Sequence, residues 1–215
     1  MKLYSMALSP WARKARIALC EKGIPFEKIS IQRKPDGTFD KPPEFLAANP
    51  RGKVPTLVDG DISVYESTLV FEYLEDTRPD TPLYPKDPKA KARCRQLVDI
   101  GDQDIGGPMT VLVQEVFSKP NEADRDQAAI AGAMEALPGV YDRLESALGN
   151  GRWFCGEQFT VADIALAIPM SVVNFLGAGP GDDHKQIKGW IGRINERPSF
   201  KKDAEEVMAA MAAMA

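Results

Sequence analysis

The stretch VPTLVDGDISVYES, residues 54–67, contains the pattern that decides the fold of the first part of this chain. Two short apolar runs flank Asp59-Gly60, a dipeptide typical of tight turns between antiparallel strands. The overlapping segment ESTLVFEYLEDT, residues 66–77, is amphipathic, because its apolar residues recur at the spacing of one helix face. Residues 54–77 are therefore predicted to form a β-hairpin followed by a helix.

The residues before this hairpin alternate between strand and helix patterns. MKLYSMAL, residues 1–8, is a short apolar run typical of a strand, and residues 10–22 repeat apolar side chains at helical spacing. PFEKISIQ, residues 25–32, alternates apolar and polar side chains as a strand does, and residues 42–50, PPEFLAANP, predict a short helix. Because a strand–helix–strand unit implies a parallel pair, the hairpin completes a small α/β domain with one mixed sheet.

A proline-rich stretch, RPDTPLYPKDPKA, follows the amphipathic helix and is typical of a linker or domain boundary. No convincing strand pattern occurs after it. Helices are expected over residues 89–117, 124–148, 159–176, 187–197 and 199–215. We therefore place an α/β domain at residues 1–80, a linker at 81–88 and an all-helical domain at 89–215.

Composition and charge exclude several functions. The chain has 215 residues, of which 44% are hydrophobic, and a formal net charge of −4. No basic face for nucleic acid is indicated. The widely spaced cysteines, Cys20, Cys94 and Cys155, include no CxxC pair, so neither a disulfide framework nor a zinc knuckle is supported. Cytoplasmic residence is expected, because neither a signal peptide nor a membrane span is recognised.

The only histidine, His184, lies in the polar stretch GPGDDHKQIK, and we expect a solvated loop side chain there. A zinc site with several histidine ligands is impossible with one histidine. A Ser-His-Asp hydrolase is not supported either, because the sequence contains no GxSxG motif. No metal ion is predicted.

Ser9 and Pro10, in ALSPWARKAR at residues 7–16, begin the first predicted helix. A serine followed by proline is a common helix start, so Ser9 serves either as a cap alone or as a chemical group as well. Glu66 and Ser67 begin the later helix in the same manner, where a serine and an acid both suit the positive end of the helix dipole. Local sequence leaves both alternatives open at each helix.

Four motifs occur in order along the chain: SPWARKARIAL at 9–19, NPRGKVPTL at 49–57, YESTLVFEYLED at 65–76 and FTVADIA at 159–165. Together they resemble the cytosolic glutathione S-transferase superfamily, over nearly the whole chain. The first motif is similar to that of the serine-type classes, which include tau, theta, zeta and bacterial relatives. The resemblance implies a thioredoxin-like α/β N-terminal domain plus an all-α C-terminal domain, the glutathione S-transferase fold.

The resemblance also implies the roles of the residues that begin the two helices. Ser9 would be the catalytic serine, whose hydroxyl and helix N-terminus favour an anionic sulfur, because a free thiol is mostly protonated at neutral pH. Glu66 would meet the ammonium of the γ-glutamyl group, and Ser67 its carboxylate. Trp11 would either wall the electrophile site or pack between the domains. Arg16 is expected to be structural.

The remaining implied contacts come from the segment before the hairpin. Val54-Pro55 would be a cis peptide that turns the Val54 backbone toward the cysteinyl part of glutathione. Lys53 would pair with the glycyl carboxylate, and Lys41 is a weaker candidate for the same group. Several relatives have a basic residue or histidine just before that lysine, where this chain has Asp40.

The resemblance predicts an enzyme that activates glutathione, its co-substrate, for attack on a small hydrophobic electrophile. It also implies a homodimer, with no nucleic acid, membrane or metal as partner. Two alternatives stay open. One is a specialised lyase or isomerase, similar to β-etherases, dehalogenases or maleylacetoacetate isomerase, although the isomerase's serine cluster is absent. The other is a non-catalytic binding module. A disulfide reductase is excluded at this site, because Ser9 and Ala12 occupy the positions of a thioredoxin dithiol.

Overall fold

The computed structural model describes residues 1–34 and 37–213. Contacts divide the chain into two compact units, one of Met1–Leu83 with Arg197–Ala215 and the other of Tyr84–Glu196. The last helix thus belongs by its contacts to the first unit. The domain boundaries given above, with a linker at 81–88, stay a prediction.

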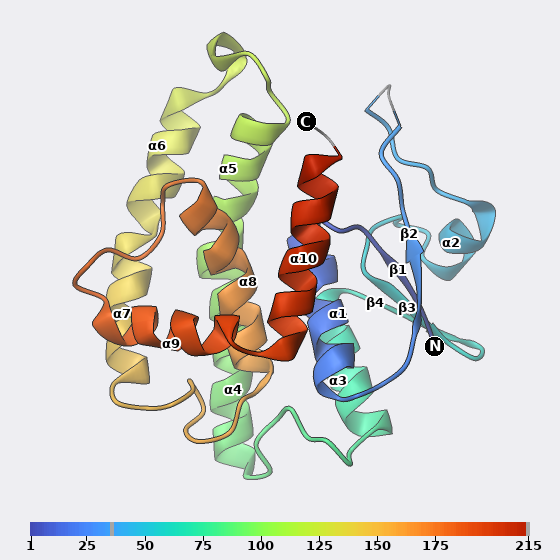
Figure 1. Ribbon diagram of the computed structural model, residues 1–215, viewed down its shortest axis with the longest axis horizontal. Helices are drawn as coiled ribbons and strands as arrows, with labels where there is room; N and C mark the ends of the chain where they lie inside the picture. Colours follow the sequence, from blue (N-terminus) through green and yellow to red (C-terminus); the bar gives the residue numbers. More distant parts are fainter. Residues whose placement is uncertain (35–36, 214–215) are drawn as a thin grey trace. The chain divides into compact units, whose positions relative to one another are not determined.

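The first unit contains a four-stranded sheet with helices packed around it (Figure 1). Its elements are β1 (Lys2–Ser5), α1 (Pro10–Glu21), β2 (Glu27–Ser30), α2 (Pro43–Ala48), β3 (Thr56–Asp59), β4 (Ile62–Tyr65), α3 (Ser67–Thr77) and α10 (Pro198–Ala212). The strand order is β2-β1-β3-β4, with β1 parallel to β2 and antiparallel to β3. The predicted hairpin is confirmed: β3 and β4 pair across a turn in which Gly60 has a φ of 65°, a conformation that suits glycine.

Both faces of this sheet are covered, because successive strand residues point to opposite sides. Tyr4 packs against Phe45 of α2, with ring centroids 4.9 Å apart, and forms a small apolar cluster with Ile31. Leu3 and Leu57 point to the other face and are fully buried. Figure 1 shows α1 and α3 along that face and α2 on the opposite one. Each face of the sheet therefore has its own apolar core.

The second unit is built of helices packed around α8. Its elements are α4 (Pro88–Ile100), a π-helical segment (Gly101–Ile105), α5 (Gly106–Phe117), a short 3-10 helix (Glu122–Asp124), α6 (Gln127–Ala136), α7 (Pro138–Leu148), α8 (Val161–Phe175) and α9 (Lys185–Asn195). Residues 161–170 of α8 are all buried, as expected for a helix that is apolar on every side. The predicted fold class, a thioredoxin-like α/β part plus an all-α part, is confirmed.

Two of the predicted helices differ in detail. The segment 89–117 contains the π-helical turn between α4 and α5, and Gly101, which begins that turn, lies directly against the backbone of α8. The segment 124–148 is two helices, because Pro138 lacks the N–H needed inside a helix and instead begins α7. Both features depend on packing or on a single residue, so apolar periodicity alone did not separate these helices.

Candidate functional site

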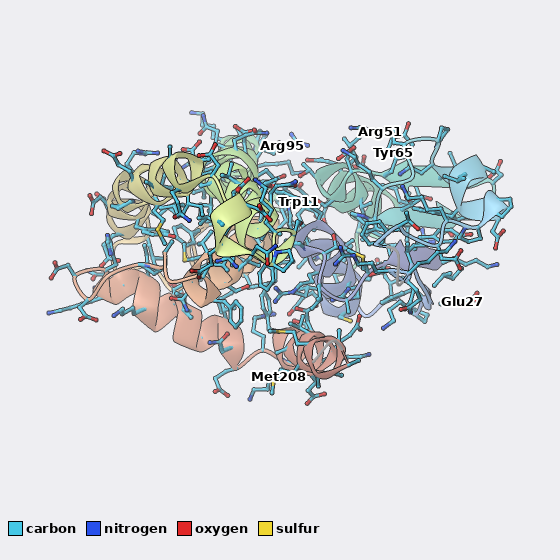
Figure 2. All side chains as sticks on the ribbon, turned by 90° about the horizontal axis from the view of Figure 1, so that it is seen from above. Trp11, Glu27, Arg51, Tyr65, Arg95 and Met208 are labelled. Carbon is cyan, nitrogen blue, oxygen red and sulfur yellow. The ribbon has the colours of Figure 1, made fainter. Side chains whose placement is uncertain are left out.

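Strand register brings the three predicted motifs of the first unit to one edge of the sheet. Tyr4 at the end of β1 pairs with Thr56 at the start of β3, which in turn pairs with Tyr65 at the end of β4. Ser9 follows β1, Pro55 precedes β3 and Glu66 follows β4. In Figure 2, Arg51 and Tyr65 lie at the same margin of this unit, and Met208 of α10 lies at the opposite margin.

Ser9 is the N-cap residue of α1, and its Oγ accepts a hydrogen bond of 3.3 Å from the backbone N–H of Ala12. The cap interaction uses an oxygen lone pair, whereas the hydroxyl hydrogen is not donated to any of the described residues. Pro10 begins the helix, so the positive end of the α1 dipole lies at this serine. A cap and a hydrogen-bond donor are therefore compatible roles for the same hydroxyl.

Arg16 supports the loop between β1 and α1 that carries Ser9. Its guanidinium donates to the Ser5 hydroxyl at 2.9 Å and to the carbonyl oxygens of Met6 and Ala7, both at 3.1 Å. The structural role expected for Arg16 is therefore confirmed. Because one planar guanidinium binds two successive carbonyl oxygens, the loop before Ser9 is anchored by a residue in the middle of α1.

The last helix supplies the counter-charge for this arginine. The Asp203 carboxylate accepts from Arg16 Nη2 at 2.6 Å and from Arg13 Nε at 2.8 Å, and its side chain is only 3% exposed. Glu206, one turn further along α10, lies 3.4 Å from Arg16 Nη1. The α10 helix is thus tied by charge to α1, although almost two hundred residues separate them.

Asn49 organises the segment between α2 and β3, and the sequence analysis did not single it out. Its buried amide donates to the Lys53 carbonyl at 2.8 Å and to Thr56 Oγ1 at 3.0 Å. Its side-chain oxygen accepts from the Arg51 backbone N–H at 3.0 Å. One side chain therefore ties together the two ends of the loop. Asn49 begins the motif NPRGKVPTL, and an asparagine before a proline was the sequence signal for a turn at this position.

The same loop contains the predicted peptide and lysines. The Val54-Pro55 bond is cis, as the resemblance implied. The Lys53 side chain is exposed. The Lys41 side chain crosses Gly52, since its ammonium nitrogen would lie 3.1 Å from a Cβ placed on that glycine. The ammonium of Lys41 therefore lies beside Gly52, the residue that precedes Lys53.

Glu66 and Ser67 begin α3 without a capping side chain. Glu66 occupies the N-cap position of α3 and Ser67 is the first helical residue, and no side chain makes the cap hydrogen bond. Glu66 is also the one non-glycine residue with positive φ, 71°, within residues 1–34 and 37–213. Such a backbone costs on the order of 1–3 kcal/mol and is found preferentially at functional sites.

The Glu66 carboxylate has a partner that the sequence analysis missed. Arg51 Nη1 donates to Glu66 Oε1 at 2.5 Å, and the two side chains are 55% and 49% exposed. Because both groups are half in water, the pair contributes little to stability and exchanges readily with other ions. The Glu66 carboxylate, which is predicted to bind the γ-glutamyl ammonium, therefore already pairs with the Arg51 guanidinium through one of its oxygens.

Trp11 lies in the first turn of α1 and is partly exposed. The ammonium of Lys14 lies 5.2 Å from the centre of the Trp11 ring and 5.4 Å from that of Phe71. Lys14 is fully buried, which is unusual for lysine, and two aromatic faces provide part of its surroundings. The ring of the motif residue Trp11 thus contacts a buried cation that the helical pattern did not reveal.

His184 differs from the solvated side chain expected. Its side chain is 13% exposed, its Nε2 lies 3.0 Å from Asp142 Oδ1, and its ring packs edge-on against Tyr141. Within the described ranges, no set of three or more His, Cys, Asp and Glu side chains is arranged to hold a metal ion. Nor does any helix of those ranges combine the length and apolarity needed to cross a membrane.

Comparison with known proteins agrees with this architecture. Two family models match, the glutathione S-transferase N-terminal domain over residues 3–82 and the glutathione S-transferase C-terminal domain over residues 108–198. FtsZ-localized protein A of Caulobacter vibrioides is 30% identical over 206 residues, which cover 93% of this chain and 88% of that protein.

Two further relatives show how varied the similar proteins are. Maleylacetoacetate isomerase of Rattus norvegicus is 33% identical over 165 residues, which cover 77% of this chain and 74% of that protein. The crystal structure of a glutathione S-transferase from Rhodospirillum rubrum F11 has 31% identity and a TM-score of 0.81, with coverage of 94% and 90%. With both of its family models matched in order and a whole-length fold in common, this chain belongs to the glutathione S-transferase family.

Proposed function

We propose that the protein is a glutathione transferase in which the Ser9 hydroxyl donates a hydrogen bond to the thiolate of glutathione. The observation that carries the proposal is the geometry of Ser9. Its oxygen caps α1, and its hydroxyl hydrogen is donated to none of the described residues, so a ligand can accept it. The positive end of α1 adds to the stabilisation of an anionic sulfur. The thiolate then attacks an electrophilic carbon and forms a sulfur–carbon bond. In a substitution, the bond from that carbon to the leaving group breaks and the group departs with its electron pair; in an addition, the double bond opens and the adjacent atom takes a proton from water.

The ends of glutathione would be held by the other groups at the same sheet edge. The γ-glutamyl ammonium would bind Glu66 through Oε2, which Arg51 does not occupy, and the γ-glutamyl carboxylate would meet Ser67 at the α3 N-terminus. The backbone of Val54, before Pro55, would bind the cysteinyl part through its N–H and C=O.

Further contacts complete the proposed site. The glycyl carboxylate would pair with Lys53. Lys41, whose ammonium lies beside Gly52, would bind the same carboxylate as a second cation. We place the hydrophobic electrophile beside Trp11, whose partly exposed ring offers an apolar wall. We further propose that the protein acts in the cytoplasm as a homodimer, as the family resemblance implies, and that glutathione is its co-substrate without a metal ion.

Two alternatives have specific support. The similarity to maleylacetoacetate isomerase favours a specialised lyase or isomerase that uses the same glutathione site. A non-catalytic binding module is favoured by the similarity to a protein named for FtsZ localisation and by the Arg51 contact on Glu66. Calorimetric titration with glutathione separates these classes, because both enzymes need to bind it. No binding at about millimolar glutathione would refute the transferase and the isomerase alike.

The role of Ser9 is tested with Ser9→Ala, with Ser9→Thr as the matched variant that keeps a hydroxyl. A hydrogen bond to a charged group contributes about 1.5–3 kcal/mol, which corresponds to about 1–2 pKa units. We expect Ser9→Ala to raise the pKa of the bound glutathione thiol by that amount, measured from the ultraviolet absorbance of the thiolate, with affinity changed only a few-fold. Ser9→Thr should keep the low pKa. An unchanged thiol pKa in Ser9→Ala would leave Ser9 as a cap only.

A further inference from the structure

A buried carboxylate of the last helix holds two arginines of the first helix. Figure 1 shows α10 along α1, and the two helices are in contact. The Asp203 carboxylate of α10 accepts one hydrogen bond from Arg16 at 2.6 Å and another from Arg13 at 2.8 Å. The position of the Arg16 guanidinium therefore depends on a residue of α10.

The terminal hydrogens of the Arg16 guanidinium have four different acceptors. Nη1 donates to the Ser5 hydroxyl at 2.9 Å and to the Met6 carbonyl at 3.1 Å. Nη2 donates to the Ala7 carbonyl at 3.1 Å and to the Asp203 carboxylate at 2.6 Å. A guanidinium is planar, and its donors point in fixed directions. The bond to the carboxylate therefore also sets the direction in which the guanidinium meets the two carbonyls.

The Met6 carbonyl connects this arginine to Ser9. Besides the Arg16 hydrogen bond, it accepts the Ser9 backbone N–H at 3.1 Å. On the other side of the residue, the Ser9 carbonyl accepts the Arg13 backbone N–H at 2.9 Å. Because the backbone is held on both sides, the direction of the Ser9 side chain is fixed as well. A chain of hydrogen bonds thus runs from Asp203 to the residue that carries the hydroxyl.

We propose that Asp203 is a positioning residue for the Ser9 hydroxyl and acts through Arg16 and the Met6 carbonyl. The inference rests on the proposed function, in which this hydroxyl donates a hydrogen bond to the thiolate of glutathione. Without the Asp203 charge, the guanidinium keeps its carbonyl partners but is drawn toward Glu206, which lies 3.4 Å from Nη1. The loop that the guanidinium holds shifts with it, and a misaligned hydrogen bond weakens steeply.

The charge of Asp203 and its positioning role have opposite effects on a bound thiol. A nearby anion disfavours a thiolate, so removal of the Asp203 charge would by itself lower the pKa of the glutathione thiol. Misalignment of the Ser9 hydroxyl instead raises that pKa, because it removes part of the about 1–2 pKa units that a hydrogen bond to a charged group supplies. We expect misalignment to dominate, since the carboxylate is already paired with two arginines.

The test measures the pKa of the bound glutathione thiol in Asp203→Asn from the ultraviolet absorbance of the thiolate. We expect an increase of about half a unit to one unit, which lowers kcat at about pH 6.5 by about three- to tenfold, with glutathione affinity changed less than about twofold. An unchanged or lowered thiol pKa would overturn the proposal.

A double variant shows whether the effect passes through the Ser9 hydroxyl. Added to Ser9→Ala, Asp203→Asn should cause no further increase in the thiol pKa, because the hydroxyl that it positions is absent. Additive increases would contradict the assigned route.

Glu21→Gln is the matched control, because it breaks a second ion pair between the same two helices. The Glu21 carboxylate accepts from Arg197 Nε at 2.8 Å, and its side chain is 10% exposed. Glu21 ends α1, whereas Ser9 caps its start. The control should lose stability but keep the thiol pKa of the unaltered protein. Equal shifts of the thiol pKa in Glu21→Gln and Asp203→Asn would assign the effect to a general loosening of α10 and refute positioning.

Arg16→Lys provides a second route if Asp203→Asn does not fold. Lysine keeps a positive charge beside Asp203 but lacks the planar donors that reach both carbonyls, so the thiol pKa should again rise. Amide hydrogen exchange adds a readout that needs no glutathione. The peptide containing the Ser9 N–H should exchange faster in these two variants than in Glu21→Gln, and equal exchange would count against the proposal.

The outcomes separate this inference from the proposed function. If the unaltered protein does not bind glutathione, or if Ser9→Ala leaves the thiol pKa unchanged, the proposed function fails and this inference fails with it. A raised thiol pKa in Ser9→Ala without one in Asp203→Asn or Arg16→Lys refutes this inference alone.

Discussion

The charge network between α1 and α10 predicts a large loss of stability from one small change, Asp203→Asn. The Asp203 side chain is 3% exposed and accepts from Arg16 at 2.6 Å and from Arg13 at 2.8 Å. Each hydrogen bond to a charged group contributes about 1.5–3 kcal/mol, so two of them contribute about 3–6 kcal/mol. Removing one partner of a buried ion pair costs about 3–5 kcal/mol, because the other charge stays buried.

The arginine keeps some of its other partners, which sets the expected value within that range. Arg16 still donates to the Met6 and Ala7 carbonyls and lies 3.4 Å from Glu206. The asparagine oxygen replaces one of the two lost acceptors. We therefore expect Asp203→Asn to lower the free energy of unfolding by about 3 kcal/mol, the lower end for a broken buried pair.

The assay is urea unfolding followed by tryptophan fluorescence and circular dichroism at one protein concentration, because subunit association would otherwise shift the midpoint. Glu206→Gln is the matched control. Its carboxylate faces the same Arg16 but is 26% exposed, so its loss should cost about 1 kcal/mol or less. A loss of stability in Asp203→Asn no greater than in Glu206→Gln would refute the reasoning from burial.

Two further predictions concern the second unit. Gly101→Ala should lower the free energy of unfolding by about 2 kcal/mol, because a Cβ there would lie 2.7 Å from the Ala165 carbonyl carbon. The control Gly107→Ala places its Cβ where no neighbouring atom lies within 4 Å and should raise the free energy of unfolding by up to about 1 kcal/mol. Equal urea midpoints for the two variants would contradict this prediction. Hydrogen bonds from Lys119 and a backbone N–H lower the pKa of Glu115, so its carboxylate stabilises the fold above the unfolded pKa of about 4.3 and loses this effect as the pH falls through the folded pKa. Glu115→Gln should therefore make the free energy of unfolding in urea less dependent on pH in the acid range. An unchanged pH dependence below about pH 5 would count against the Glu115–Lys119 ion pair.

Much of the candidate site was predictable because its signals are local. The Ser9 cap depends on residues three positions apart, and the hairpin depends on the strand pattern around Asp59-Gly60. The cis peptide at Val54-Pro55 came only from the motif resemblance. The roles of Ser9, Glu66 and Lys53 toward glutathione stay predictions.

Other parts of the site were not predictable from local pattern. Arg51 pairs with Glu66 across fifteen positions, and Asn49 holds a loop whose shape no periodicity describes. Of the two alternatives for Ser67, a helix cap or a contact to glutathione, the cap is not formed, since Glu66 occupies the cap position with a positive φ. Whether a side chain caps a helix depends on the backbone angles of the entering chain, and these are set by the strand that precedes it.

The sequence by itself determined the strands, most of the helices and their order, because periodicity, turn dipeptides and helix caps act over a few residues. Only the tertiary structure decided which distant groups meet. It brought Asp203 to Arg16 and Gly101 to the backbone of α8. The physical reason is that charge interactions and close packing depend on distance through space, whereas the order of residues specifies distance only along the chain.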